Sequence, residues 1–227
     1  MKRAKPQEFP QTSTMRATSK AASLAAKNRT HLCHFLLALG LSGALVGCGG
    51  AAARPAQESL AALHTPRRLF PMGEGYSWAF RNDPGGGLPV QTSVLRVTSV
   101  RGTQAQIESL ATGDARTYDL REDGLFWVDA NLYLIHTPIR VGTSWPSSNA
   151  RTATITEADV AVDVPTGHFD HCIVVTEEGG TSGLTVRTTY CPDVGPTIVA
   201  THQTLQLVAA GTSTRSELQA YQQGEDE

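Results

Sequence analysis

Two histidines and a cysteine stand close together in the stretch HFDHC, and these residue types bind zinc. They are His168, His171 and Cys172. On a strand, side chains three positions apart point to opposite faces, so the two histidines would not converge on one ion. The preceding Pro165-Thr166-Gly167 indicates a turn that leads into a strand. We therefore predict no metal site here. The stretch DPGGGLP lacks the lysine and helix of a phosphate loop, so no cofactor is predicted either.

Nucleophilic catalysis is the second chemistry to consider. One large class of hydrolases carries its nucleophile in Gly-x-Ser-x-Gly, between a strand and a helix, and the sequence contains no such motif. Ser182 lies in the glycine-rich stretch GGTSGLT, which is typical of a hairpin tip. Glu177 and Glu178 are adjacent, so on a strand they face opposite sides and do not form an acid–base pair. A hydrolase with catalytic residues dispersed along the chain is the alternative to a non-catalytic protein.

Cys48 follows a segment with the layout of an export signal. Residues 1–47 contain seven basic residues and one acid, so their net charge is 7 − 1 = +6. Residues 35–46 carry no charge, and this apolar run is shorter than the roughly 20 residues that a membrane-spanning helix needs. A basic region followed by a short apolar region predicts a secretory signal rather than a membrane span.

The end of this apolar run, Leu45-Val46-Gly47-Cys48, resembles the lipobox of bacterial lipoproteins. The resemblance implies that residues 1–47 are a signal peptide cleaved after Gly47 and that the Cys48 thiol carries a diacylglyceryl group. The acyl chains would anchor the protein to the membrane, at about 0.8 kcal/mol per buried methylene. Gly49, and not aspartate, follows the cysteine. By the sorting rule of enteric bacteria, this resemblance favours the outer membrane within the cell envelope.

The chain after Cys48 is acidic. It holds 12 arginines, no lysine and 20 acidic residues, so its net charge is 12 − 20 = −8. This charge argues against nucleic acid as a partner and against a polybasic surface that binds anionic lipid. The lipid on Cys48 would therefore be the attachment to the membrane.

Cys172 and Cys191 are the two thiols outside the leader and the lipid site. An exported protein folds in an oxidising compartment, where disulfides form. A hairpin that is symmetric about residues 181–182 places the two cysteines opposite each other. Directly opposed residues have Cα atoms about 4.5 Å apart at a non-hydrogen-bonded position, which is within reach of a disulfide. We predict this disulfide; the alternatives are two free buried cysteines or a metal pair with the histidines of HFDHC.

The domain that positions these residues is predicted to be β throughout. Threonine and valine are abundant, and glycine, proline, asparagine and aspartate interrupt the chain at short intervals. We predict an all-β domain over residues 66–211, with one antiparallel meandering sheet as an open half-barrel or a sandwich. Residues 48–65 are predicted to be a flexible tether, of which 56–63 have the composition for one or two helical turns, and 212–227 an acidic tail. The predicted strands are 76–81, 90–100, 104–111, 116–121, 124–128, 132–135, 151–158, 161–164, 170–177, 184–191, 197–202 and 204–209.

Two glycine turns each lead into a strand that carries a tryptophan three positions after the glycine. These tryptophans are Trp78 and Trp145. A large aromatic ring at the start of a strand is typical of a core position. We predict Trp78, Trp145, Phe169 and Tyr190 as residues that anchor the core.

Four sequence blocks between residues 69 and 207 resemble, in order, those of a family of uncharacterised bacterial secreted proteins and lipoproteins. The blocks are LFPMGEGYSWAFR, HTPIRVGTSWP, VDVPTGHFDHCIVVTEE and TTYCPDVGPT. The resemblance implies an extracytoplasmic β-rich domain without a known reaction. Cys172 and Cys191 depart from it, because the family positions need not be cysteines.

The sequence as a whole predicts a non-catalytic lipoprotein of the cell envelope. Its expected partners are the membrane, through the lipid, and an envelope protein or an apolar ligand. A half-barrel would offer a concave apolar face, as in proteins that carry lipoproteins between membranes. A smooth apolar groove would favour such a carrier, a deep pocket with converging histidine, aspartate or arginine would favour an enzyme, and a flat sheet would favour a scaffold.

Overall fold

The structure is a computed structural model that describes residues 59–204 and 211–224. The predicted signal peptide, Cys48 and most of the predicted tether lie outside the described residues, as does nearly all of the predicted strand 204–209. Within the described residues no helix is long and apolar enough to cross a bilayer.

Strands dominate the described residues, and the helices are short. The elements are α1 (Leu60–Leu63), α2 (Pro66–Leu69), β1 (Ser77–Asp83), β2 (Gln91–Arg101), β3 (Gln104–Ser109), β4 (Ala115–Arg121), β5 (Gly124–Trp127), β6 (Leu132–His136), β7 (Ser144–Pro146), the 3₁₀ turn η1 (Ser148–Ala150), β8 (Arg151–Val164), β9 (Gly167–Gly179), β10 (Leu184–Cys191), β11 (Gly195–Thr204) and β12 (Gly211–Gln222).

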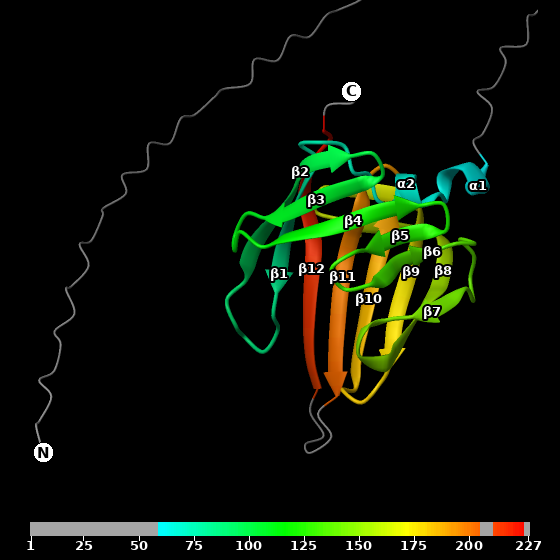
Figure 1. Cartoon of the computed structure of the whole chain (residues 1–227). Coiled ribbons are helices and arrows are strands. Elements are labelled where there is room, and N and C mark those ends of the chain that lie inside the picture. Colours follow the sequence, from blue (N-terminus) through cyan, green and yellow to red (C-terminus); the bar gives the residue numbers. More distant parts are fainter. Residues whose placement is uncertain (1–58, 205–210, 225–227) are drawn as a thin grey trace, which may run out of the picture. The chain divides into compact units, whose positions relative to one another are not determined.

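All twelve strands belong to one antiparallel sheet, with the order β6-β5-β4-β3-β2-β1-β12-β11-β10-β9-β8-β7. Each strand pairs with its neighbours in sequence, except that β6 and β7 do not pair with each other; in addition, the first strand, β1, pairs with the last, β12. The two free edges of the sheet are therefore β6 and β7, in the middle of the chain (Figure 1). The prediction of an all-β domain with one antiparallel meandering sheet is confirmed.

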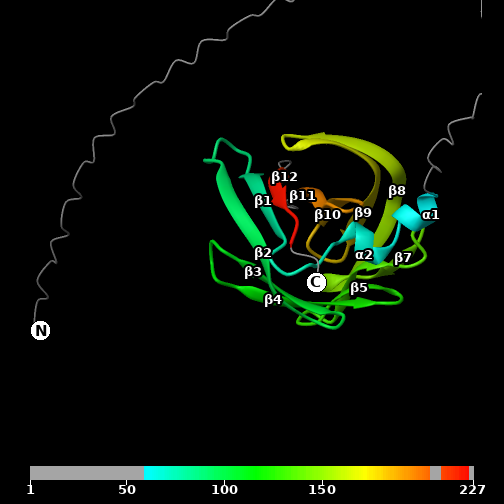
Figure 2. The ribbon, with the colours of Figure 1, turned by 90° about the horizontal axis from the view of Figure 1, so that it is seen from above.

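The sheet curls into a ring, which Figure 2 shows from one end. The free edges meet where the Trp145 indole of β7 donates a hydrogen bond to the Tyr133 carbonyl of β6, with an Nε1–O distance of 3.0 Å. The ring of Trp145 also stacks on that of His136. The sheet is thus one nearly closed layer, more closed than the predicted open half-barrel and without the second sheet of a sandwich.

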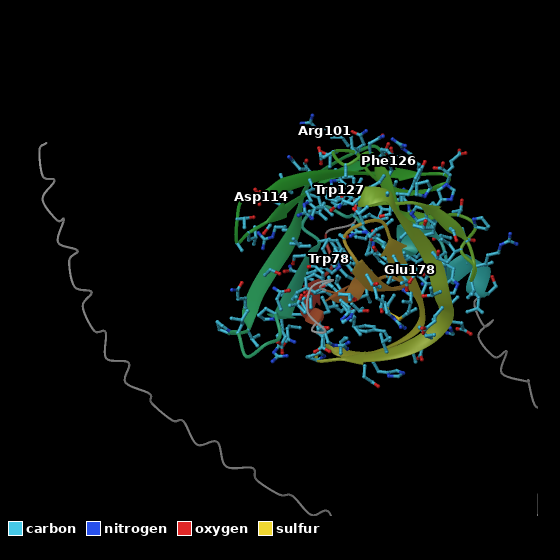
Figure 3. The ribbon with its side chains drawn as sticks, turned by 90° about the horizontal axis from the view of Figure 1, so that it is seen from below. Trp78, Arg101, Asp114, Phe126, Trp127 and Glu178 are labelled. Carbon is cyan, nitrogen blue, oxygen red and sulfur yellow. A yellow bond between two sulfur atoms is a disulfide. The ribbon has the colours of Figure 1, made fainter. Side chains whose placement is uncertain are left out.

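The core fills the inside of this ring. Aromatic side chains meet there, and Trp78 lies inside the ring in Figure 3. Phe70, just after α2, has its ring centroid 5.4 Å from that of Trp78 and 5.7 Å from that of Tyr118. Leu69 of α2 is completely buried. Helix α2 therefore covers one end of the ring with apolar side chains (Figure 2).

The predicted tether ends earlier than residue 65. Ser59 caps α1, its hydroxyl accepting a hydrogen bond from the Ala62 N–H. Leu63 of α1 is buried, and His64 Nε2 lies 2.8 Å from the His171 carbonyl oxygen. These contacts join residues 59–65 to the domain.

The predicted acidic tail is wrong over most of its length. Gly211–Gln222 forms β12, which pairs with β1 on one side and β11 on the other. Its large apolar residues are Leu218, which is completely buried, and Tyr221, which stacks on Tyr76. The stretch is mostly polar because much of this strand faces solvent, and so its sequence resembles a tail.

Two further differences concern single strands. The predicted strands 151–158 and 161–164 are one long strand, β8, whose register against β9 shifts three times. Bulges of this kind bend a hairpin, and the β8–β9 hairpin curves over the outer face of the sheet (Figure 2). Strand β7, of three residues, was not predicted because it is too short to show a period.

Candidate functional site

The candidate site lies at the end of the ring that α2 covers. Thr65 caps α2, and Pro66 occupies its first turn, where a proline needs no N–H partner. The helix ends at Leu69, two residues before Pro71, and the chain then runs through residues 71–76 into β1. This short path directs Leu69 into the core and leaves the Arg67 side chain exposed at the end of the ring.

The turn between β10 and β11 is bound to α2 and Tyr76 at this end of the ring; we call these contacts of Asp193 with Arg68 and Tyr76 the clamp. Arg68 of α2 forms an ion pair with Asp193, with an Nε–Oδ1 distance of 2.8 Å and a second contact from its other nitrogen to Oδ2. The Asp193 N–H donates to the Arg68 carbonyl at 2.6 Å. The Tyr76 hydroxyl donates to the Asp193 carbonyl at 2.7 Å. Burial, with smaller effects from Tyr221 and Asp193, raises the pKa of Tyr76 well above its usual value, so this phenol stays protonated and donates.

Trp78 fixes the same turn from inside the ring. Its Nε1 donates to the Val194 carbonyl at 2.6 Å. Gly195 has φ +94°, and a Cβ there would lie 3.0 Å from Trp78 Nε1, so the turn requires glycine for both its conformation and its space. The first and fourth sequence blocks, which contain Tyr76 and Asp193, therefore meet here.

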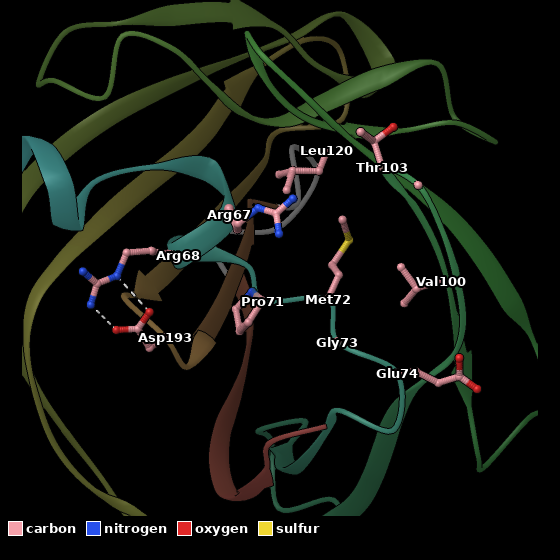
Figure 4. A pocket seen from close by; sticks show the side chains of 11 residues that line it. Arg67, Arg68, Pro71, Met72, Gly73, Glu74, Val100, Thr103, Leu120 and Asp193 are labelled. Atoms are coloured by element: carbon pink, nitrogen blue, oxygen red, sulfur yellow. Dashed lines mark hydrogen bonds and ion pairs between the residues drawn. The ribbon is translucent and has the colours of Figure 1, made fainter. Parts of the chain in front are cut away.

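Beside this clamp the structure forms an open pocket of about 550 Å³. This volume lies within the range of small-molecule sites in proteins. The pocket combines apolar side chains with charged ones: it is lined by Arg67, Arg68, Pro71, Met72, Gly73, Glu74, Val100, Gly102, Thr103, Leu120 and Asp193. The side chains of Met72 and Leu120 and the Arg67 guanidinium converge over its centre, and Val100 forms one wall (Figure 4).

Most polar groups of the pocket already have partners. Arg68 and Asp193 bind each other, as described above. The Thr103 hydroxyl donates to Asp119 Oδ1 at 2.7 Å, and this hydrogen bond is the main reason that the pKa of Asp119 is lowered. Glu74 is exposed and points away from the cavity (Figure 4). Arg67 forms no ion pair with any residue that the structure describes, and its guanidinium is directed at the apolar wall.

A second hollow lies on the outer face of the sheet, under the β8–β9 hairpin. Its volume is about 350 Å³, and a neighbouring hollow of about 490 Å³ shares Arg187, Ala200 and Arg215 with it. The two arginines are neutralised, Arg187 by Glu157 at 2.5 Å and Arg215 by Glu217 at 2.7 Å. The pocket beside α2 therefore has the better arrangement for a charged ligand.

The histidines of HFDHC lie on the β8–β9 hairpin and bind aspartates separately. His168 contacts Asp163 through Nδ1 at 2.7 Å and Asp170 through Nε2 at 3.2 Å. His171 contacts Asp159 at 2.6 Å. Among residues 59–204 and 211–224, no three histidines, cysteines or acidic residues form a group that could hold a metal ion.

The serine and glutamate candidates, Ser182 and Glu177, have different hydrogen-bond partners. Ser182 lies between β9 and β10, and its hydroxyl accepts a hydrogen bond from the Leu184 N–H. Glu177 binds the Ser147 hydroxyl and the buried Arg151, whose nitrogen lies 3.3 Å from Oε2. A serine beside a carboxylate without an imidazole lacks the base of a catalytic triad.

The remaining predicted residues are placed as follows. Cys172 and Cys191 form a disulfide, with Cα atoms 4.2 Å apart. Trp78, Trp145 and Tyr190 are buried in the core. Phe169 is only partly buried, because it lies on the curved hairpin and packs against Tyr221 of β12. Cys48 lies outside the described residues.

Sequence reasoning missed the pocket residues Arg67, Met72, Val100 and Leu120. Arg67 lies two residues before the first sequence block and Met72 lies within it, and Pro66 with Pro71 marks a short helix there. The other two come from β2 and β4 and have no common spacing with the first pair. Only the curling of the sheet brings them together.

Comparisons with known proteins find distant likenesses only. No family model and no curated protein matches the chain, so the family suggested by the four sequence blocks stays a prediction. Two solved structures are similar to it: a proposed lipoprotein from Parabacteroides distasonis, with 14% identity and a TM-score of 0.38, and a proposed exported protein with a YmcC-like fold from Bacteroides fragilis, with 13% identity and a TM-score of 0.39. Each likeness covers 68% of this chain and 98% of the other. TM-scores this low support no argument about function.

Proposed function

We propose that this protein is a non-catalytic, lipid-anchored protein of the bacterial cell envelope, whose pocket beside α2 binds the apolar chain of a small amphiphile. The observation that carries the proposal is the open pocket of about 550 Å³ with Met72, Val100 and Leu120 in its lining. The hydroxyl and carboxylate groups around it hold structural partners, which fits binding better than catalysis.

The position of the pocket in the chain supports an amphiphile supplied by the membrane. The pocket is built on α2, and α2 follows Ser59 by only seven positions. If Cys48 carries lipid, the 59 − 48 = 11 residue steps to Ser59 span at most about 40 Å when fully extended. A pocket at the N-terminal end of the domain would therefore stay close to the bilayer surface.

The lipid anchor is tested by acyl labelling. Wild-type protein and Cys48→Ala are expressed with a metabolic acyl label in a bacterium that processes lipoproteins. We expect label in the wild type and none in the variant. Equal labelling of both proteins would overturn the anchor.

The pocket is tested with the neutral apolar dye N-phenyl-1-naphthylamine and the exported, non-lipidated Cys48→Ser protein. The dye should fluoresce on binding, and Val100→Glu should weaken its binding at least about tenfold, because a carboxylate in an apolar site is costly to desolvate. Val128→Glu is the matched control, since Val100 and Val128 are both 37% exposed and Val128 lies outside the pocket.

Both variants should keep the thermal unfolding temperature of the parent within a few degrees. If Val100→Glu remained folded and bound the dye as tightly as Val128→Glu does, the dye site would lie elsewhere and the proposal for this pocket would fail.

A further inference from the structure

Some charged side chains around the pocket beside α2 have ion-pair partners, and others do not. Arg68 and Asp193 neutralise each other at one side, and Glu74 points away at the other (Figure 4). Arg67 has no ion-pair partner among residues 59–204 and 211–224, and it lines the same pocket as Met72 and Leu120. The pocket thus presents one free positive group next to an apolar wall.

A guanidinium in this position favours a particular kind of anion. It is charged at every physiological pH and presents a planar set of N–H donors that matches the two oxygens of a carboxylate. Charge-assisted bonds of this kind are the stronger class of hydrogen bond. Arg67 alone is available in this pocket to neutralise a ligand, which favours a head group with a single negative charge.

The apolar residues define the rest of the ligand. Met72 is an unbranched, adaptable side chain that fits chains of variable shape. Val100, Leu120 and Pro71 complete a surface that would lie along a single alkyl chain extending from the head group. Because the arginine and the apolar wall adjoin, the charged and apolar parts of the ligand must be directly connected.

We propose that Arg67 binds the carboxylate of a single-chain fatty acid, whose alkyl chain lies against Met72, Val100 and Leu120. This inference rests on the proposed binding function of the same pocket and adds the class of ligand and the residue that selects it.

The experiment compares decanoate with 1-decanol, which has the same chain and no charge. Both displace the dye from the Cys48→Ser protein at pH 7.5 and low salt, below the concentrations at which they aggregate. We expect decanoate to compete about tenfold more strongly than decanol, and Arg67→Gln to abolish this preference.

Arg140→Gln is the matched control. Arg140 is exposed, forms no ion pair with a described residue and does not line the pocket, so this variant loses the same charge elsewhere. It should retain the preference for decanoate. Added salt should reduce the preference in the parent and in Arg140→Gln, because it screens an exposed charge.

The outcomes separate the two proposals. The fatty-acid assignment is overturned if the dye binds but decanoate and decanol compete equally. It is also overturned if Arg67→Gln keeps the preference for decanoate. In both cases the proposal that the pocket binds an apolar chain still stands. Failure of the parent protein to bind the dye, decanol and decanoate overturns both.

Discussion

Single residues at the α2 end of the ring connect parts of the chain that lie far apart in sequence. Trp78 is completely buried and donates its indole N–H to the Val194 carbonyl, 116 positions away. Its ring contacts Phe70 and Tyr76. One side chain thus packs the core and also fixes the turn that bears Asp193, beside the pocket.

Trp78→Ala should therefore destabilise the domain by about 3–5 kcal/mol, the cost of removing a large buried aromatic side chain. Trp78→Phe fills most of the space and loses only the hydrogen bond to Val194, so it should cost less. Urea denaturation followed by circular dichroism measures both. A loss below about 1 kcal/mol for the alanine variant would contradict the role assigned to Trp78 in the core.

His168 offers a test of the electrostatics of the β8–β9 hairpin. The hydrogen bond that His168 donates to Asp163 is the main cause that raises the pKa of His168 above its usual value; the charge of Asp163 and the same two effects of Asp170 follow. A raised histidine pKa stabilises the folded state at pH values below the unfolded-state pKa, and that contribution is lost as the pH rises through the folded-state pKa.

Titration by NMR should thus give His168 a pKa above about 6.5, the value of an unperturbed histidine. Asp163→Asn should lower this pKa more than Asp170→Asn, because Asp163 makes the larger contribution. This prediction is contradicted if Asp163→Asn leaves the pKa of His168 unchanged. His168 is exposed, so the effect belongs to the hairpin and not to global stability.

At the scale of elements, the β9–β10 hairpin has the strand register that its sequence predicts. Val186 pairs with Glu177 and Tyr190 with Ile173, which is the register of a hairpin that is symmetric about residues 181–182. The cysteines continue this register and are completely buried. The disulfide thus fixes the register of two strands rich in threonine and valine, whose residue pattern would also allow a shifted register.

Replacing both cysteines by alanine should destabilise the domain by about 1–3 kcal/mol. The chain-entropy model gives about 3 kcal/mol for a loop of this length, and measured values often fall short of it. Denaturation of the variant is compared with that of the wild type with and without reductant. Equal midpoints under all conditions would mean that the bond does not stabilise the fold.

The whole molecule depends on the pairing of β1 with β12. This pairing joins residues 77–83 to 215–222 and turns a linear meander into a ring whose free edges, β6 and β7, are adjacent in sequence. The hydrogen bond from Trp145 to Tyr133 then joins those two edges. Closure leaves little sheet edge open to another chain.

A chain that ends at Thr204 should therefore fail to fold, because it lacks β12 and leaves one edge of β1 and one edge of β11 unpaired. A chain that ends at Gly224 is the control, since it keeps β12 and the close approach of Gly224 to the Glu74 carbonyl. Soluble yield and cooperative thermal unfolding distinguish the two. Cooperative unfolding of the shorter chain would show that Gly211–Gln222 behaves as the tail expected from its composition.

The sequence by itself determined most of the strands, with β7 and β12 as the exceptions, and the register of β9–β10. These features depend on neighbours along the chain: alternation of apolar and polar residues, glycine and proline at turns, and symmetry about a turn. It also indicated the buried positions of Trp78 and Trp145, because a large aromatic residue at a strand start has few other roles.

Only the tertiary structure decided where β12 belongs, how far the sheet closes and where a pocket forms. Each of these depends on contacts between residues far apart in the chain. Arg67 and Leu120, for example, lie 53 positions apart and share no pattern, yet both line the pocket. A mostly polar strand such as β12 carries little local signal, because its place is fixed by the unpaired backbone groups of β1 and β11, which occupy both of its sides.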